Sequence, residues 1–202
     1  AKALAQKPVK VTLVDSSNHH LFQPLLYQVA TAGLSPAEIA IPIRAVLRRA
    51  KNVRTIMARA DTIDLEGRRV ELADGEALHY DRLIIAAGAR STYFGNDQWR
   101  RYAPPMKSIE DATEVRREIL LAFERADRIA DPVERQRELT FAVIGGGPTG
   151  VALAGALVEL STKALAADFR RISPAQARVV LIEGGDRLLA GMSPESSEAA
   201  KR

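Results

Sequence analysis

Three glycines at fixed spacing are the residues of this chain whose chemistry is easiest to assign. Gly145, Gly147 and Gly150 complete a GxGxxG pattern within the stretch LTFAVIGGGPTGVALAG. In a strand–turn–helix unit the first glycine permits a tight turn, the second lets the backbone approach a pyrophosphate, and the third packs the helix against the strand. The free amides and the positive dipole end of the helix would bind the phosphates. We therefore predict a dinucleotide site at this turn.

The residues on either side of the glycines have the patterns of the strand and helix that such a site requires. Residues 141–144 form a short β-prone run, and Pro148 stands where a helix takes its first residue. The apolar residues that follow, from Val151 to Val158, keep helical spacing. An ordinary glycine-rich loop is the competing interpretation, but it would need neither of these flanking patterns.

An acidic residue follows the next predicted strand. A helix predicted over residues 151–171 leads to a strand over 178–182 that ends at Glu183, the position where a dinucleotide fold binds the adenosine ribose hydroxyls. Glu183 comes 33 residues after Gly150, more than the usual ~20, and the long helix and the loop around Ser173 absorb the difference. A carboxylate there favours NADH over NADPH, since a 2′-phosphate would meet a like charge.

Asp15 has the same position in the first part of the chain, at the end of a strand predicted over residues 9–14. In a dinucleotide fold it would bind ribose, with its glycine loop about 20 residues earlier; a simple turn aspartate is an equal interpretation. Residues 18–44, rich in amide and imidazole groups, suit a loop and short helix that cover a ligand. His19 and His20 could serve acid–base chemistry, although helix-capping or solvated roles are more common.

The middle of the chain predicts strands and one long helix. Residues 53–73 alternate as in a β-hairpin or meander, with Glu66-Gly67 at a turn. Residues 82–88, RLIIAAG, form an unbroken apolar run typical of a strand buried in a parallel sheet. A helix is predicted from Ser35-Pro36 to about residue 50, and a longer one from a Ser108 cap to about residue 130.

Composition excludes several classes of protein. Of 202 residues, 47% are hydrophobic and 27% charged, and the net charge of +4 is dispersed along the sequence, so it gives weak support for a nucleic-acid or membrane surface. Without cysteine there is no disulfide or thiolate metal site, and with three histidines we predict no metal site. No apolar run is long enough to span a bilayer. Both ends stop in mid-pattern, so we expect a fragment.

Four stretches together resemble the type II NADH dehydrogenases, which are FAD-dependent NADH:quinone oxidoreductases. They are NHHLFQPLLYQVATAGLSPAEIA, YDRLIIAAGARSTYFG, KSIEDATEVRREILLAFERAD and VIGGGPTGVALAGALVEL. The resemblance implies an α/β protein with two Rossmann-like dinucleotide-binding folds, an FAD domain with an inserted NADH domain, both incomplete, and a β-meander. Residues 1–108 would be a partial FAD-binding domain lacking its GxGxxG, and residues 109–202 a linking helix plus a partial NADH-binding domain.

The resemblance also implies site residues, cofactors and partners. NADH would give a hydride to FAD, and two electrons would pass to a membrane quinone. The protein would be a homodimer attached peripherally, through a C-terminal region outside this chain, to the cytoplasmic face of the inner (plasma) membrane, with no nucleic-acid partner. The implied FAD contacts are Asp15, Ser16, Gln23, Ala60, Ala87 and Gly88, and the implied NADH contacts are Gly145, Gly147, Pro148, Thr149, Gly150 and Glu183.

One residue departs from the family pattern. The family usually reads GPTGVELAG, and here Ala152 replaces the glutamate, whose carboxylate is a proposed proton-handling or substrate-orienting group. No catalytic residue is therefore assigned, and we expect Ala152→Glu in a full-length protein to raise quinone turnover. We also expect the isolated chain to bind FAD poorly and to be inactive.

Two other functions stay open. One is a related flavoprotein reductase of the sulfide:quinone or ferredoxin type, which the absence of cysteine disfavours. The other is a paralogue that binds nucleotide with impaired turnover because of Ala152.

Overall fold

Two parallel strand pairs, one in each half of the sequence, organise the structure, a computed structural model that describes residues 1–201. The chain divides into two compact units, Ala1–Phe22 with Ala37–Ala89 and Gln23–Pro36 with Arg90–Arg202. Each unit contains one of the parallel pairs, and helices and strands occur in both halves of the sequence. The predicted α/β class with two Rossmann-like folds and a meander is confirmed. The predicted functional boundary after residue 108 stays a prediction.

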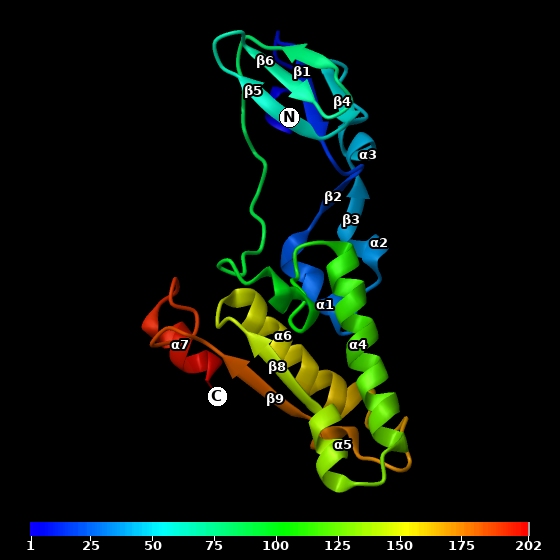
Figure 1. Ribbon diagram of the computed structural model, residues 1–202. Helices are drawn as coiled ribbons and strands as arrows, with labels where there is room; N and C mark the ends of the chain where they lie inside the picture. The colour runs from blue at the N-terminus through cyan, green and yellow to red at the C-terminus, as the bar shows by residue number, and fades with distance from the viewer. Residues whose placement is uncertain (202) are drawn as a thin grey trace. The chain divides into compact units, whose positions relative to one another are not determined.

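Seven α-helices and nine strands are described, as labelled in Figure 1. The helices are α1 Leu26–Ala30, α2 Pro36–Ile39, α3 Ile43–Leu47, α4 Ile109–Arg128, α5 Pro132–Glu138, α6 Pro148–Glu159 and α7 Pro194–Ala200. The strands are β1 Val11–Asp15, β2 His19–Leu21, β3 Ala40–Pro42, β4 Val53–Met57, β5 Ala60–Asp64, β6 Arg69–Leu72, β7 Ala77–His79, β8 Thr140–Ile144 and β9 Arg178–Ile182. Short 3-10 helices cover Lys2–Leu4, Gln23–Leu25, Asp97–Arg101 and Pro174–Gln176, and a π-helical turn covers Leu160–Ala164.

The first unit combines a parallel pair with an antiparallel meander. β1 and β4 run parallel with Asp15 opposite Met57, and β5, β6 and β7 form an antiparallel three-stranded sheet. The predicted turn at Glu66-Gly67 is confirmed, with the Gly67 amide donating to the Asp64 carboxylate at 2.8 Å. The prediction that residues 53–57 belong to the meander is wrong, because β4 takes its hydrogen bonds from β1 instead.

The helix predicted from Ser35 to about residue 50 is broken in two. Between α2 and α3, residues Ala40–Pro42 form β3, which pairs antiparallel with β2. Pro42 has no amide proton and cannot donate to a carbonyl one turn earlier, so a continuous helix cannot pass through it. The strand ladder with β2 uses the backbone groups of this stretch instead.

The predicted buried strand over residues 82–88 is absent from the described residues. No strand of the first unit pairs with this run, and the side chains of Ile84 and Ile85 are 77% and 67% exposed. A strand is stable only when a neighbour takes up its amide and carbonyl groups. The run is therefore extended but unpaired.

In the second unit, helices pack on one face of the β8–β9 pair. α6 contacts both strands, and α1 contacts α4 and α6 (Figure 1). One apolar core joins these elements; it contains Ile119, Phe123, Ala126, Leu139, Val143, Leu157, Leu160 and Ile172. The Phe123 and Phe141 rings lie 5.5 Å apart between centroids, within the range of favourable aromatic pairs. The helical spacing predicted for α4 is confirmed by the burial of Ala112, Ile119 and Ala122.

Two helix ends in the second unit differ from the prediction. α6 ends at Glu159 rather than near Arg171, and the π-helical turn follows. The hydroxyls of Ser161 and Thr162 both donate to the Val158 carbonyl, at 2.9 and 2.6 Å, and such side-chain bonds compete with the regular helical pattern. After the predicted end of the long helix near residue 130, Asp131 caps the first turn of a further helix, α5.

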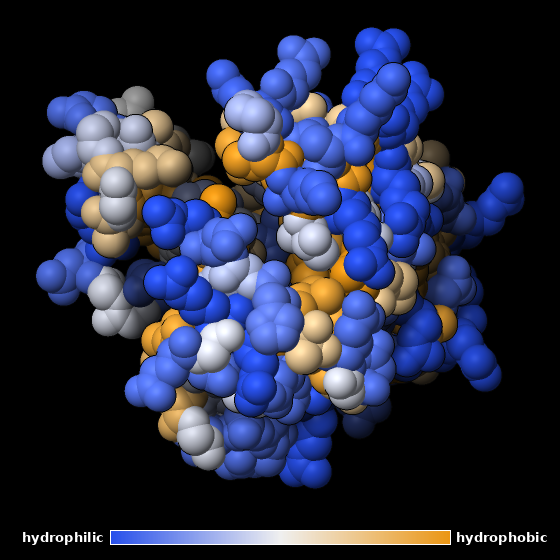
Figure 2. All heavy atoms as spheres, turned by 90° about the horizontal axis from the view of Figure 1, so that it is seen from above, coloured by the Kyte–Doolittle hydropathy of each residue, from blue (hydrophilic) through white to orange (hydrophobic). Residues whose placement is uncertain are grey.

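The surface mixes charged and apolar side chains. Figure 2 shows apolar residues as separate patches among hydrophilic ones on the visible face. Several ion pairs, such as Arg59–Asp61 and Lys163–Glu159, lie on exposed side chains and each contributes little to stability, whereas Arg100 pairs with the buried Asp111. Within residues 1–201 no helix is both long and apolar enough to cross a membrane.

Candidate functional site

The GxGxxG residues form a tight turn between β8 and α6. Gly145 follows the last residue of β8 with φ of 106°, a conformation that favours glycine. Its amide donates to the Ile182 carbonyl at 2.8 Å, so the turn starts at the carboxyl end of the parallel pair. Gly147 is the N-cap of α6 and Pro148 is its first residue. The predicted strand–turn–helix unit is confirmed.

Gly147 and Gly150 meet different surroundings within this turn. A Cβ at Gly150 would lie 3.1 Å from the Gly145 carbonyl carbon and would overlap the Gly145 carbonyl oxygen. A Cβ at Gly147 would meet no atom within 4 Å. The backbone is therefore packed at Gly150 and open at Gly147, immediately before the first turn of α6. A side chain on residue 147 would extend into this opening.

Glu183 lies beside the turn, bound to it by its carboxylate. Its Oε2 accepts a hydrogen bond from the Gly146 amide at 2.5 Å, and its Oε1 accepts from the Gly185 amide at 2.7 Å. These two amides, Gly146 first, hold the pKa of the Glu183 carboxyl below the ordinary value of a glutamate. The side chain is exposed, so an ionised carboxylate with free lone pairs stands next to the open turn.

The loop after Glu183 closes the other side of Gly146. The Leu189 amide donates to the Gly146 carbonyl at 2.7 Å, and a Cβ at Gly146 would lie 2.7 Å from Leu188 Cδ2. Sequence reasoning missed this role of Gly146, the variable position of the motif. The signal that was present in the sequence is the run of three consecutive glycines, of which Gly146 is the middle one.

Asp15 and Ala60, two of the predicted FAD contacts, lie at the end of β1 and the start of β5. Asp15 ends β1, and its carbonyl accepts from the Ala58 amide at 2.9 Å, in the segment that joins β4 to Ala60. The carboxyl edge of parallel strands is where such folds bind ligands. The Asp15 carboxylate accepts from the Ser17 amide at 2.8 Å, which is the turn interpretation considered for this residue. That bond uses one of several lone pairs, so ribose binding is compatible with it.

The other predicted FAD contacts lie on less regular segments. Ser16 is an exposed residue directly after β1. Ala87 and Gly88 belong to the unpaired run after residue 82, where Gly88 has φ of 73°. In the second unit, the side-chain Nε2 of Gln23 donates to the Lys107 carbonyl at 3.1 Å.

No carboxylate stands at the position of the family glutamate. Ala152 lies half-buried in the first turns of α6, and a methyl group can neither accept a proton nor donate a hydrogen bond. Thr149, the other predicted contact in this turn, is exposed in the first turn of α6. Among residues 1–201 no three acidic or imidazole side chains gather so as to hold a metal ion.

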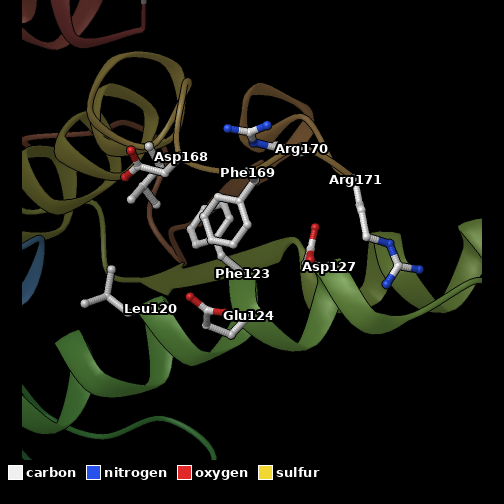
Figure 3. A pocket seen from close by; sticks show the side chains of 9 residues that line it. Leu120, Phe123, Glu124, Asp127, Asp168, Phe169, Arg170 and Arg171 are labelled. Carbon is white, nitrogen blue, oxygen red and sulfur yellow. The ribbon is translucent and has the colours of Figure 1, made fainter.

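A separate hollow of about 620 Å³ lies in the second unit, between α4 and the turn before Ile172. Figure 3 shows Glu124 and Asp127 on α4 pointing toward Phe169, with Arg170 and Arg171 beside it. None of the predicted cofactor contacts lines this hollow. The candidate site is therefore the glycine turn with Glu183 and the following loop.

The sequence profile of the pyridine nucleotide-disulphide oxidoreductases matches residues 1–202. The type II NADH:quinone oxidoreductase NdhA of Mycobacterium tuberculosis is 48% identical over 205 residues, which cover 100% of this chain and 44% of that protein. The type II NADH:quinone oxidoreductase Ndh of the same organism is 46% identical over 203 residues, covering 99% of this chain and 44% of that protein. The chain thus spans less than half the length of these relatives.

Solved structures of similar proteins have the same fold. NDH2 from Plasmodium falciparum, solved in complex with NADH, superposes with a TM-score of 0.82 at 26% identity, over 94% of this chain and 40% of that chain. The sulfide:quinone oxidoreductase from Aquifex aeolicus has a TM-score of 0.71 at 19% identity, over 97% of this chain and 43% of that chain. At that identity the likeness shows the fold alone.

Proposed function

Since the chain belongs to the pyridine nucleotide-disulphide oxidoreductase family, we propose that its protein is an FAD-dependent enzyme that passes electrons from NADH to a membrane quinone. The observation that carries the proposal is the open turn at Gly147, with the Glu183 carboxylate beside it, in a chain close in sequence to two type II NADH:quinone oxidoreductases. The dinucleotide part of the proposal rests on the turn. The quinone part rests on the names of the relatives.

NADH would bind at the glycine turn through the backbone. The opening at Gly147 admits the pyrophosphate, and the amides of the first turn of α6 face it with the positive end of the helix dipole. Pro148 donates no amide of its own but holds the helical φ of the first residue. Thr149 and Gly150 complete the turn, and Glu183 accepts hydrogen bonds from the adenosine ribose. The charge of Glu183 disfavours a 2′-phosphate, which makes NADH the preferred substrate.

FAD would bind in the first unit at the carboxyl edge of β1 and β4. Asp15 and Ser16 would contact its ribose, and the backbone at Ala60 its adenine. Ala87 and Gly88 would complete the contacts of this unit with FAD, and Gln23 of the second unit is a further proposed contact. When bound, FAD supplies the chemistry that joins a two-electron hydride donor to a quinone acceptor.

The domain boundary, assembly and location belong to the same proposal. Residues 1–108 would serve FAD and residues 109–202 NADH. The full-length protein, by which we mean this chain together with the segments that bring it to the length of its relatives, would be a homodimer attached peripherally to the cytoplasmic face of the inner (plasma) membrane.

A paralogue that binds NADH without efficient turnover is the second candidate, and Ala152 is the observation that favours it. The first turns of α6 carry no carboxylate at this position, so a proton there has no side-chain acceptor. Binding is unaffected because the phosphate contacts are backbone groups.

Anaerobic titration of the full-length flavoprotein with NADH tests the proposal. We expect the flavin absorbance near 450 nm to bleach with about one equivalent of NADH and to recover on addition of a quinone. NADH binding without bleaching would favour the paralogue, and bleaching that ferredoxin or polysulfide reverses but quinone does not would contradict the quinone assignment.

A further inference from the structure

Arg187 makes all of its described hydrogen bonds to the backbone of its own loop. Its Nη2 donates to the Ala190 carbonyl at 2.7 Å and to the Met192 carbonyl at 3.1 Å, and its Nη1 donates to the Met192 carbonyl at 3.1 Å. The Met192 amide also donates to the Leu189 carbonyl at 2.8 Å. The guanidinium therefore ties residues 187–192 into a closed loop, which we call the clamp loop.

The clamp loop contacts one residue of the glycine turn, Gly146. The Leu189 amide donates to the Gly146 carbonyl at 2.7 Å, and Leu188 Cδ2 leaves no room for a side chain on Gly146. The carboxylate of Glu183, which precedes the clamp loop in the sequence, accepts a hydrogen bond from the Gly146 amide. Gly146 is buried, so these three contacts determine its position and, through the chain, that of Gly147.

The clamp loop has a backbone that requires support. Leu189 has φ of 51°, a left-handed conformation that is unfavourable for a non-glycine residue. Such a conformation persists only where surrounding contacts determine it. Arg187 supplies such contacts, because its fork of donors binds the carbonyls of Ala190 and Met192, which follow Leu189 in the loop.

We propose that Arg187 is a positioning residue for NADH, which acts by holding the clamp loop on Gly146 and so presents the Gly147 opening and the Glu183 carboxylate in one arrangement. This inference rests on the proposed function. The described hydrogen bonds of Arg187 all go to loop carbonyls, so its proposed role is to hold the loop and not to contact the dinucleotide. Removing it leaves the glycine turn in place but lets the opening and the carboxylate move relative to one another.

The test compares Arg187→Met and Arg187→Lys with wild-type full-length protein, and Arg178→Met is the matched control. Arg178 is an exposed arginine at the start of β9, the end of the strand away from Glu183. We expect Arg187→Met to raise both the NADH dissociation constant and the KM for NADH about tenfold, the worth of one or two charge-assisted hydrogen bonds, with kcat unchanged. Arg187→Lys keeps the positive charge but lacks the fork of donors, so its NADH dissociation constant should lie between those of wild type and Arg187→Met.

Two results separate this inference from the proposed function. A lower melting temperature of Arg187→Met with an unchanged NADH dissociation constant would make Arg187 merely structural and overturn the inference. A wild type that binds NADH but does not reduce quinone would overturn the proposed function, and the dissociation constants of the variants would still decide the role of Arg187.

Discussion

Gly147 and Gly150 belong to one motif but have different physical tasks. At Gly150 a side chain would overlap the Gly145 carbonyl, so this glycine is required for folding of the turn. At Gly147 the backbone has φ of −75° and ψ of 179°, which any residue adopts, and the space around it is open. The fold itself therefore does not require a glycine at position 147, and we expect the requirement to come from the proposed ligand.

Gly147→Ala and Gly150→Ala should separate these two tasks. We expect Gly147→Ala to keep the melting temperature of the full-length protein and to weaken NADH binding at least tenfold, since the methyl occupies the pyrophosphate space. Gly150→Ala should destabilise the protein by about 1–3 kcal/mol, the usual cost of forcing extra atoms into packed structure. Gly155→Ala, in α6 with open space around it, is the control and should stabilise by about 0.5–1 kcal/mol. Unchanged NADH affinity of Gly147→Ala would remove the pyrophosphate from this turn.

Glu183→Gln should relax the preference for NADH over NADPH. The amide keeps an acceptor for ribose but loses the charge that repels a 2′-phosphate, so we expect the ratio of kcat/KM values to fall about tenfold, or about 1.4 kcal/mol. Glu66→Gln, at the exposed β5–β6 turn, is the control. Equal ratios for Glu183→Gln and wild type would show that this carboxylate does not select the nucleotide.

The lowered pKa of the Glu183 carboxyl sets the pH dependence of that preference. Hydrogen bonds from the Gly146 and Gly185 amides hold the pKa below its ordinary value. The carboxylate therefore stays ionised at and above about pH 5, and the preference for NADH over NADPH should be constant there. These two hydrogen bonds also contribute to stability. That contribution is present above the pKa that Glu183 has in the unfolded chain, and it is lost as the pH falls through the lowered pKa of the folded protein. A preference that declined between pH 7 and pH 5 would contradict this pKa direction.

The three glycines of the GxGxxG motif and Glu183 could be predicted from the sequence, whereas the contacts of Gly146 and Arg187 could not. The first set follows from local pattern, because a strand, a turn and a helix in sequence determine where the glycines and the strand-end acid lie. The contacts of Arg187 depend on a loop whose Leu189 has a left-handed backbone. The residue types at 188–192, LLAGM, do not predict that conformation, since leucine rarely adopts it.

At the scale of elements, the start of α4 depends on one buried carboxylate. Asp111 is 8% exposed and accepts from the backbone amides of Lys107 and Ser108, each at 3.0 Å. It also pairs with Arg100 at 3.3 Å, while the Ser108 hydroxyl accepts from the backbone amide of Asp111. One side chain thus joins the segment before α4 to the first turn of the helix.

Asp111→Ala should lower the free energy of unfolding by about 1–3 kcal/mol. The substitution removes the capping contacts and leaves two amides without a partner. Glu110→Ala, next to it and exposed in the same turn, should stay within about 0.5 kcal/mol of wild type. Urea unfolding followed by circular dichroism measures both, and equal midpoints for the two variants would count against a capping role for Asp111.

Helices with a cap and a periodic apolar face were predictable, and their interruptions were not. The Ser108 cap and the buried positions of α4 follow from local spacing. The break at Ala40–Pro42 depends on β2, which lies about 20 residues earlier in the sequence. The short helix α5 escaped prediction because Asp131-Pro132, a pattern that ends a helix, also begins one.

At the scale of the whole molecule, each unit repeats one arrangement, a parallel pair with an acidic residue at the carboxyl end of a strand. Asp15 ends β1 and Glu183 follows β9. The two-fold recurrence was predictable because each copy carries its own local pattern. The sheet in which residues 82–88 would lie was not, because a strand's state depends on neighbours that the local sequence does not specify.

Residues 82–88 should become a buried strand in the full-length protein. The run RLIIAAG is apolar at consecutive positions, which suits burial on both faces, yet Ile84 and Ile85 are mostly exposed here. A neighbouring strand would remove that apolar surface from water and pair the backbone groups of the run. We expect amide hydrogen exchange at residues 83–86 to be slowed on the order of 100-fold relative to the turn at Asp74-Gly75. Equal exchange rates in the two segments would mean that the apolar run serves another contact than a sheet.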